Sequence, residues 1–203
     1  MIIYKDFLFF KKLTNIGNDM KNIFFLIALS SSIIFLTGCE TTSSIPYSAS
    51  TENVLQFQSA LSKSDIKVKL GDFEENTEIG ELTCRLLGPI DVSRGKTRAE
   101  YIKDAMQSEL FLAQAYSVDS EIMIEGRLDS LTFSSVSPAS WEFGFTIYSN
   151  KSKGYSVKTK YPFNTSYSAY SSCKNVADAF GPAVQDLINT IIIHPDFNQL
   201  TGQ

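Results

Sequence analysis

Residues 141–147 read Trp-Glu-Phe-Gly-Phe-Thr-Ile, and this strict alternation of apolar and polar positions decides the fold class. Because successive side chains of a β-strand point to opposite faces, Trp141, Phe143 and Phe145 share one face. Residues 155–161 repeat the alternation after a short polar turn that contains a glycine, which predicts an antiparallel hairpin. The apolar face of this hairpin has to be covered by another layer of the domain.

Three segments upstream of the hairpin alternate in the same way, at 66–70, 82–86 and 122–128. Together with the hairpin they predict a mostly antiparallel sheet of four to five strands. Pro162 should end regular pairing, because proline has no amide hydrogen to donate to a neighbouring strand.

Two helices complete the predicted domain. Thr97 and Glu100 form a capping-box sequence, which predicts a helix over 97–116. The final helix carries an apolar stripe over 176–191, and Pro182 inside it should kink this single element. The predicted order is β-α-β-β-β-α, an α+β fold with both helices packed on one face of the sheet.

The apolar strand face is rich in aromatic side chains, which are Trp141, Phe143, Phe145 and Tyr155. One interpretation is that they fill the core beneath the helices. The other is that they line a groove for an apolar ligand. We favour the core and keep the groove as the alternative.

Glu109 falls in the middle of the apolar arc of the helix predicted over 97–116. A buried carboxylate is costly unless it is paired or hydrogen-bonded. One hypothesis is therefore a proton-transfer acid with a raised pKa. We favour the other, in which the side chain bends to the rim or accepts hydrogen bonds from a neighbouring loop.

The start of the chain has the pattern of an export signal. Residues 1–38 contain a basic start followed by an apolar stretch, and a start codon at Met20 would make this signal peptide compact. Residues 36–39, Leu-Thr-Gly-Cys, resemble the lipobox of bacterial lipoproteins, which implies that Cys39 is acylated and becomes the first residue. The alternative is a transmembrane anchor with a chance cysteine at its end. Glu40 follows, where Asp is associated with inner-membrane retention, so the resemblance favours the outer membrane.

Residues 39–64 are expected to be a lipidated tether, with a short helix around 54–61, and 65–203 a single α+β domain. The tether is rich in Thr, Ser and Pro and should hold the domain a few tens of ångströms from the membrane. From Cys39 onward 14 basic and 20 acidic side chains give a net charge of −6, which argues against nucleic acid as a partner. No apolar run beyond Cys39 approaches the roughly 20 residues needed to span a bilayer.

Little in the sequence supports catalysis or metal binding. His194 is the single histidine, and no nucleophile motif accompanies it. A zinc site needs several Cys or His ligands, so we expect no metal and no cofactor. The acidic run at 72–81 lacks the glycine of a calcium loop, and we expect a solvated loop there.

Cys84 and Cys173 are the only cysteines besides Cys39. Because the signal directs export to an oxidising compartment, we predict that they form a disulfide. The alternative is two separate buried thiols.

Three segments carry a further resemblance, at 105–110 (Ala-Met-Gln-Ser-Glu-Leu), 124–128 (Ile-Glu-Gly-Arg-Leu) and 180–188 (Phe-Gly-Pro-Ala-Val-Gln-Asp-Leu-Ile). Behind a lipobox, and over residues 66–193, this order of elements resembles small α/β lipoproteins that assist envelope transport. These are the lipopolysaccharide-assembly lipoprotein of the LptE type, the auxiliary lipoproteins of ABC-type lipid transporters and the YajG-like group. The segment at 72–96 and the cysteine pair depart from them.

Two functions follow as hypotheses. The first is a non-enzymatic accessory lipoprotein, anchored in the outer membrane through Cys39 and facing the periplasm, which docks on an envelope assembly or transport protein. The second is a carrier for a lipid or another hydrophobic ligand.

Overall fold

A four-stranded sheet in the order β1-β2-β3-β4 forms one layer of the protein. Its strands are β1 (Lys69–Glu75), β2 (Met123–Ser134), β3 (Ser140–Ser149) and β4 (Tyr155–Pro162). β2, β3 and β4 pair antiparallel, as predicted, whereas β1 runs parallel to β2. The sheet is therefore mixed. The reason lies in the connection, since a helical crossover between β1 and β2 returns the chain to the same end of the sheet.

The computed structural model describes residues 44–61 and 64–202, so the signal peptide, Met20, Cys39 and Glu40 lie outside the described residues. Within that part the helices are α2 (Thr51–Ala60), α3 (Arg98–Leu112), α4 (Ala169–Asp178) and α5 (Phe180–Ile192), with short turns η3 (Arg85–Leu87) and η4 (Phe197–Thr201). None of the helices in these two ranges is long and apolar enough to cross a membrane.

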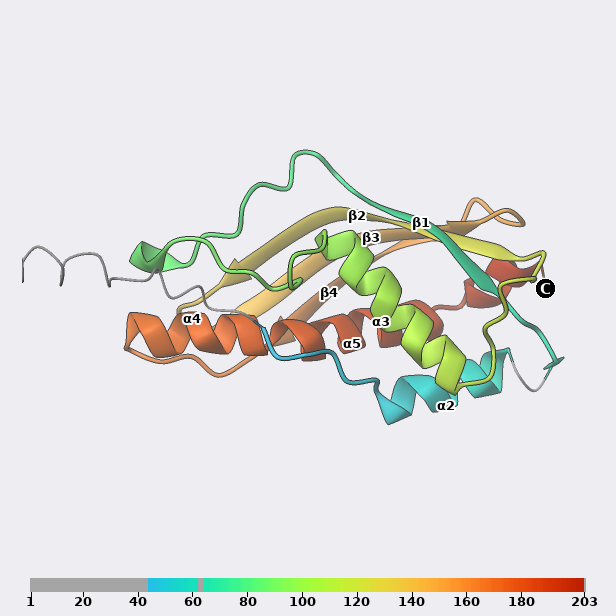
Figure 1. Cartoon of the computed structure of the whole chain (residues 1–203), viewed down its shortest axis with the longest axis horizontal. Coiled ribbons are helices and arrows are strands. Elements are labelled where there is room, and N and C mark those ends of the chain that lie inside the picture. The colour runs from blue at the N-terminus through green and yellow to red at the C-terminus, as the bar shows by residue number, and fades with distance from the viewer. Residues whose placement is uncertain (1–43, 62–63, 203) are drawn as a thin grey trace, which may run out of the picture. The chain divides into compact units, whose positions relative to one another are not determined.

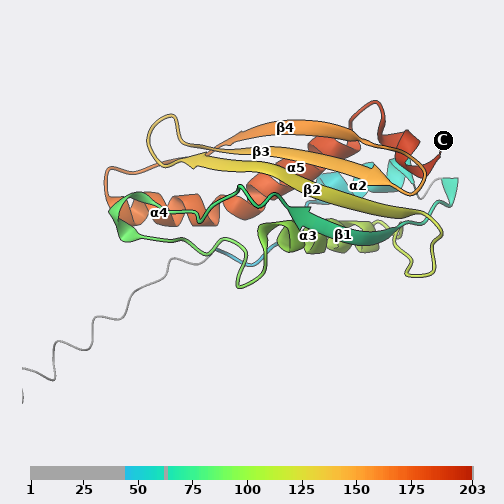
Figure 2. The ribbon, with the colours of Figure 1, turned by 90° about the horizontal axis from the view of Figure 1, so that it is seen from above.

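The helices cover one face of the sheet (Figures 1 and 2). α3 contacts β1 and β2, α5 contacts β3 and β4, and α2 packs against α3 and α5. The predicted α+β class, with helices on one face, is confirmed. Thr97 and Glu100 form the predicted capping box at the start of α3.

The aromatic strand face is core. Trp141, Phe143 and Phe145 are buried, and the ring of Phe180 on α5 lies against the first two. The indole Nε1 of Trp141 donates to the carbonyl of Val176 at 2.9 Å. The close packing also explains why position 126 is glycine, because a Cβ there would lie 2.5 Å from the ring of Phe145.

Two predictions about the region before α3 were wrong. Residues 82–86 do not form a strand of the sheet; Thr83 makes a single bridge to Pro89, and η3 follows. Residues 72–75 are not a loop, since β1 starts later than expected and runs through them. Only Phe73 of this stretch is buried, and Glu75 pairs with Arg98 at the start of α3. These tertiary contacts stabilise a strand in an acidic stretch for which the sequence predicted a loop.

The C-terminal helical region is two elements, and the prediction of one kinked helix was wrong. α4 ends at Asp178 and α5 begins at Phe180, around Ala179. Pro182 has no amide hydrogen to donate to the carbonyl of Asp178, so a continuous helix would lack this hydrogen bond. In the first turn of a separate α5 no such bond is needed, which explains why two helices form.

The N-terminal segment (residues 44–61) is part of the domain, which corrects the expected tether. Phe57 and Leu61 are fully buried, and Ser44 donates from its hydroxyl to the carbonyl of Val92 at 2.8 Å. The short helix expected near 54–61 is α2, which begins earlier, at Thr51. The composition of this segment predicted a solvated tether. Phe57 and Leu61, which are spaced four residues apart, instead form an apolar stripe on the helix that packs against α3 and α5.

Candidate functional site

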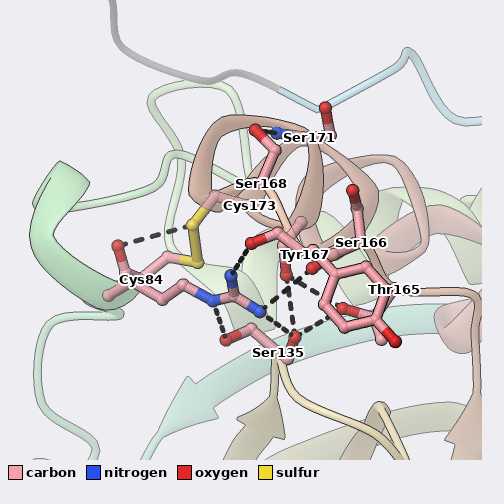
Figure 3. The surroundings of a disulfide bond; sticks show 10 residues. Cys84, Ser135, Thr165, Ser166, Tyr167, Ser168, Ser171 and Cys173 are labelled. Carbon is pink, nitrogen blue, oxygen red and sulfur yellow. Dashed lines mark hydrogen bonds between the residues drawn. A yellow bond between two sulfur atoms is a disulfide. The ribbon is translucent and has the colours of Figure 1, made fainter.

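Cys84 and Cys173 form the predicted disulfide (Figure 3). Their Cα atoms are 5.8 Å apart, and both side chains are fully buried. The bond joins the turn before η3 to the middle of α4, elements 89 residues apart in sequence. Such a long closed loop stabilises the fold by restricting the unfolded chain.

Arg85 binds three backbone carbonyls next to this disulfide. Its Nη2 donates to Ser135 at 2.8 Å and to Ser166 at 3.3 Å, and its Nη1 donates to Tyr167 at 3.3 Å. The backbone of Arg85 has φ +50°, a left-handed conformation that costs a non-glycine residue about 1–2 kcal/mol. Among the described residues no carboxylate forms an ion pair with this guanidinium. Arg85 therefore fixes the loops that contain Ser135 and Ser166 to η3. Its guanidinium also places a positive charge beside the disulfide.

Apolar side chains project from the elements that Arg85 and the disulfide hold together. We call this group the disulfide end; it consists of Leu86, Leu87, Val136, Tyr167 and Tyr170. Leu86 and Tyr167 are fully exposed, and a hollow of about 470 Å³ lies between Arg85, Val136 and Tyr167. Exposed apolar groups gathered at one rigid point are typical of an interaction surface.

Glu109 forms a second polar cluster, between α3 and the N-terminal segment. Its carboxylate is fully buried and accepts hydrogen bonds from the Tyr47 hydroxyl at 2.6 Å and the Ser50 amide at 2.9 Å. The Asn53 side chain donates to it at 3.1 Å. The hydrogen-bonded interpretation of Glu109 is therefore the one that the structure supports, with the N-terminal segment as the neighbouring loop.

Burial raises the pKa of Glu109, and the three hydrogen bonds oppose that shift. Burial and the hydrogen bond to Glu109 also raise the pKa of Tyr47. Asn53 extends the cluster to α5, because its Nδ2 donates to the Gln185 carbonyl at 2.9 Å and its Oδ1 accepts from Asn189 at 3.0 Å. This arrangement fastens the N-terminal segment to two helices.

The other predicted residues have structural surroundings. Tyr155 is partly buried, donates from its hydroxyl to the Ile191 carbonyl at 2.6 Å and stacks on His194 at 4.0 Å. His194 accepts the Asp196 amide hydrogen at 3.2 Å. In residues 44–61 and 64–202, no group of three or more His, Cys, Asp or Glu side chains is placed to hold a metal ion.

The sheet face opposite the helices is polar, and its charges are separated by strand. Its charged side chains are Lys69, Asp72 and Glu74 on β1, Glu125, Arg127 and Asp129 on β2, Glu142 on β3, and Lys158 and Lys160 on β4. Lys160 pairs with Glu142 at 2.6 Å, whereas Lys158 forms no ion pair within the described residues. The face is thus mainly acidic at β1 and β2 and basic at β4.

Sequence reasoning missed Arg85, Tyr47 and Asn53. Arg85 was placed in a strand that does not form, and the other two in the tether. One signal could have shown that the expected short helix packs on the domain, since Asn53, Phe57 and Leu61 are spaced four residues apart and lie on one helix face.

No protein-family model matches the chain, and no curated protein matches it. Among solved structures, the chain is similar to the crystal structure of protein XCC0632 from Xanthomonas campestris, described with the family model DUF330. The identity is 9% and the TM-score 0.38, with 63% of this chain and 84% of that chain covered.

Proposed function

We propose that the protein is a lipid-anchored accessory lipoprotein, held through Cys39 in the outer membrane, which faces the periplasm and docks on an envelope assembly or transport protein. The docking surface is the polar face of the sheet. In this proposal the protein positions a partner and catalyses no reaction.

One observation carries the proposal: among the described residues the polar sheet face is covered by no helix, and its charges are separated by strand. Burial and the carboxylates of Glu125 and Glu74 raise the pKa of Tyr148 on this face, in accord with its acidic side. Lys158 lies on the basic side. A surface with two regions of opposite charge fixes the orientation of a partner more than it adds affinity.

The state of the aromatic face supports the accessory role over the carrier role. Trp141, Phe143 and Phe145 are at most 2% exposed, so their rings are already in contact with protein. A carrier would need a hollow lined by such side chains. The hollow at the disulfide end is open, and polar groups of Arg85 and Ser166 form part of its wall.

The test is crosslinking in intact envelopes with the full-length protein and an amine-reactive reagent. We expect a stoichiometric envelope protein whose capture falls about fivefold in Lys158→Glu, the change expected for loss of up to about 1 kcal/mol at an exposed charge. Lys103→Glu is the matched control, because it makes the same charge change on α3, in the helical layer.

Equal loss of capture in both variants would indicate a general charge effect and would contradict docking through the sheet. Bound lipid recovered in stoichiometric amounts, without any crosslinked protein, would favour the carrier.

A further inference from the structure

The distance between the proposed lipid anchor and the folded domain is short. Ser44 is the first described residue, and it lies five residues after Cys39. Five residues span at most about 18 Å when fully extended. If Cys39 carries acyl chains, this short connection keeps the domain against the membrane surface. A tether that ended only at residue 64 would have allowed the domain to lie further from the membrane.

Ser44 is fixed to the loop that follows η3. Its amide donates to the Asp91 carbonyl at 3.1 Å, and its own carbonyl accepts from Arg94 at 3.2 Å. Asp91 follows Leu87 by four residues, a span of at most about 14 Å. Ser44, the first described residue after the proposed anchor, is therefore close to the disulfide end.

The disulfide end has the chemistry of a membrane-contacting surface. Leu86 is fully exposed, Leu87 and Val136 are about half exposed, and two tyrosines lie beside them. Tyrosine is enriched at membrane–water interfaces, where its ring is apolar and its hydroxyl is hydrated. The guanidinium of Arg85, without a carboxylate partner in the described chain, adds a positive charge that favours lipid phosphate.

We propose that the disulfide end rests in the headgroup region of the phospholipid leaflet in which Cys39 is anchored, and that it orients the domain on that surface. The disulfide and Arg85 hold its loops rigid, so the contact is preformed. This inference rests on the proposed anchor at Cys39. It leaves the polar sheet face available to a protein partner.

A second exposed apolar pair offers a matched control. Phe111 and Leu112, at the end of α3, are 70% and 55% exposed. They precede the start of β2, whereas Val136 follows the end of that 12-residue strand, and a strand of this length spans about 40 Å. The two apolar groups therefore lie toward opposite ends of the sheet, and only the disulfide end is near Ser44.

The test uses the full-length lipidated protein reconstituted in phosphatidylethanolamine–phosphatidylglycerol vesicles that contain a phospholipid with a diazirine in its acyl chain. After photolysis, mass spectrometry maps lipid adducts to peptides. We expect about tenfold more adducts at 84–92, 135–139 and 164–172 than at 109–118, a preference that corresponds to about 1.4 kcal/mol. The double substitution Leu86→Ser and Leu87→Ser should abolish most of that preference, and Phe111→Ser with Leu112→Ser should not.

Each other outcome overturns the inference. Adducts concentrated at 109–118, or absent from the disulfide end, would assign its apolar side chains to a protein partner. The intact mass of the same sample separates the two proposals. Acyl chains on Cys39 with adducts elsewhere would refute only the orientation, whereas absence of acyl chains would refute the anchor and the inference that rests on it.

Discussion

Replacement of Glu109 by alanine should release the N-terminal segment and leave the sheet folded. The carboxylate accepts hydrogen bonds from Tyr47, Ser50 and Asn53; the Tyr47 hydroxyl and the Ser50 amide would lose their partner, and Asn53 would keep only the Gln185 carbonyl as acceptor. Hydrogen bonds to a charged group contribute about 1.5–3 kcal/mol each, and their sum is reduced because water can enter the space. A buried donor left without a partner costs about 1–3 kcal/mol, so the cluster as a whole should lose about 3–5 kcal/mol.

That loss can be compared with what else holds the segment in place. Apart from this cluster, the buried side chains of Phe57 and Leu61 hold the segment, and they contribute about 1.5–3 kcal/mol each. A loss of about 3–5 kcal/mol at Glu109 is comparable with that contribution and should be enough to detach α2.

Hydrogen exchange followed by mass spectrometry measures this directly. We expect amides of α2 to exchange about a hundredfold faster or more, because each 1.4 kcal/mol changes the open population tenfold. Amides of β3 should keep most of their protection. Glu52→Ala is the control, since it removes a carboxylate from the exposed side of the same helix.

Two results would refute this reasoning. If α2 stays protected in Glu109→Ala, the carboxylate does not fasten the segment. If amides of α2 and β3 lose protection together, Glu109 supports the whole domain and the segment has no separate stability.

Three further predictions rest on the structure and one on the sequence. Phe143→Ala should cost about 3–5 kcal/mol in a thermal melt, because a buried aromatic side chain leaves a cavity; a shift of a degree or two with loss of bound lipid would instead indicate a groove. Burial raises the pKa of Glu109 above its ordinary 4.5, so the stabilisation from its protonated form is present below pH 4.5 and is lost as the pH rises through the folded-state pKa. The melting temperature should therefore depend less on pH in Glu109→Gln than in the unmodified protein. An unchanged pH dependence would point to another group. Alkylation of denatured, unreduced protein should label neither Cys84 nor Cys173, and labelling of both would show that the bond does not form in the cell. Cys39→Ala should leave an uncleaved precursor, and intact-mass analysis that finds cleavage elsewhere without lipid would contradict the lipobox assignment.

Local pattern in the sequence was sufficient for about half of the architecture. The alternation at 122–128, 141–147 and 155–161 predicted β2, β3 and β4 and their pairing, because strand periodicity is a property of neighbouring residues. The capping box predicted the start of α3 for the same reason. The disulfide followed from a count, since Cys84 and Cys173 are the only cysteines besides Cys39 and the export expected from the sequence would expose them to oxidation.

The disulfide end could not be predicted from local pattern. Leu86 and Tyr167 have no periodicity that marks them, and they meet only because Arg85 and the disulfide bring distant loops together. Of the site residues, the sequence predicted Cys84 and Cys173 alone.

The tertiary structure alone decided how β1 pairs and where residues 44–61 lie. Alternation cannot show whether a strand runs parallel to its neighbour, because the direction is set by the crossover through α3. Composition made the N-terminal segment look solvated, since its stabilising partners, Glu109 on α3 and Asn189 on α5, are distant in sequence. A buried carboxylate and a polar segment each look costly alone, and only their contact in the fold satisfies both.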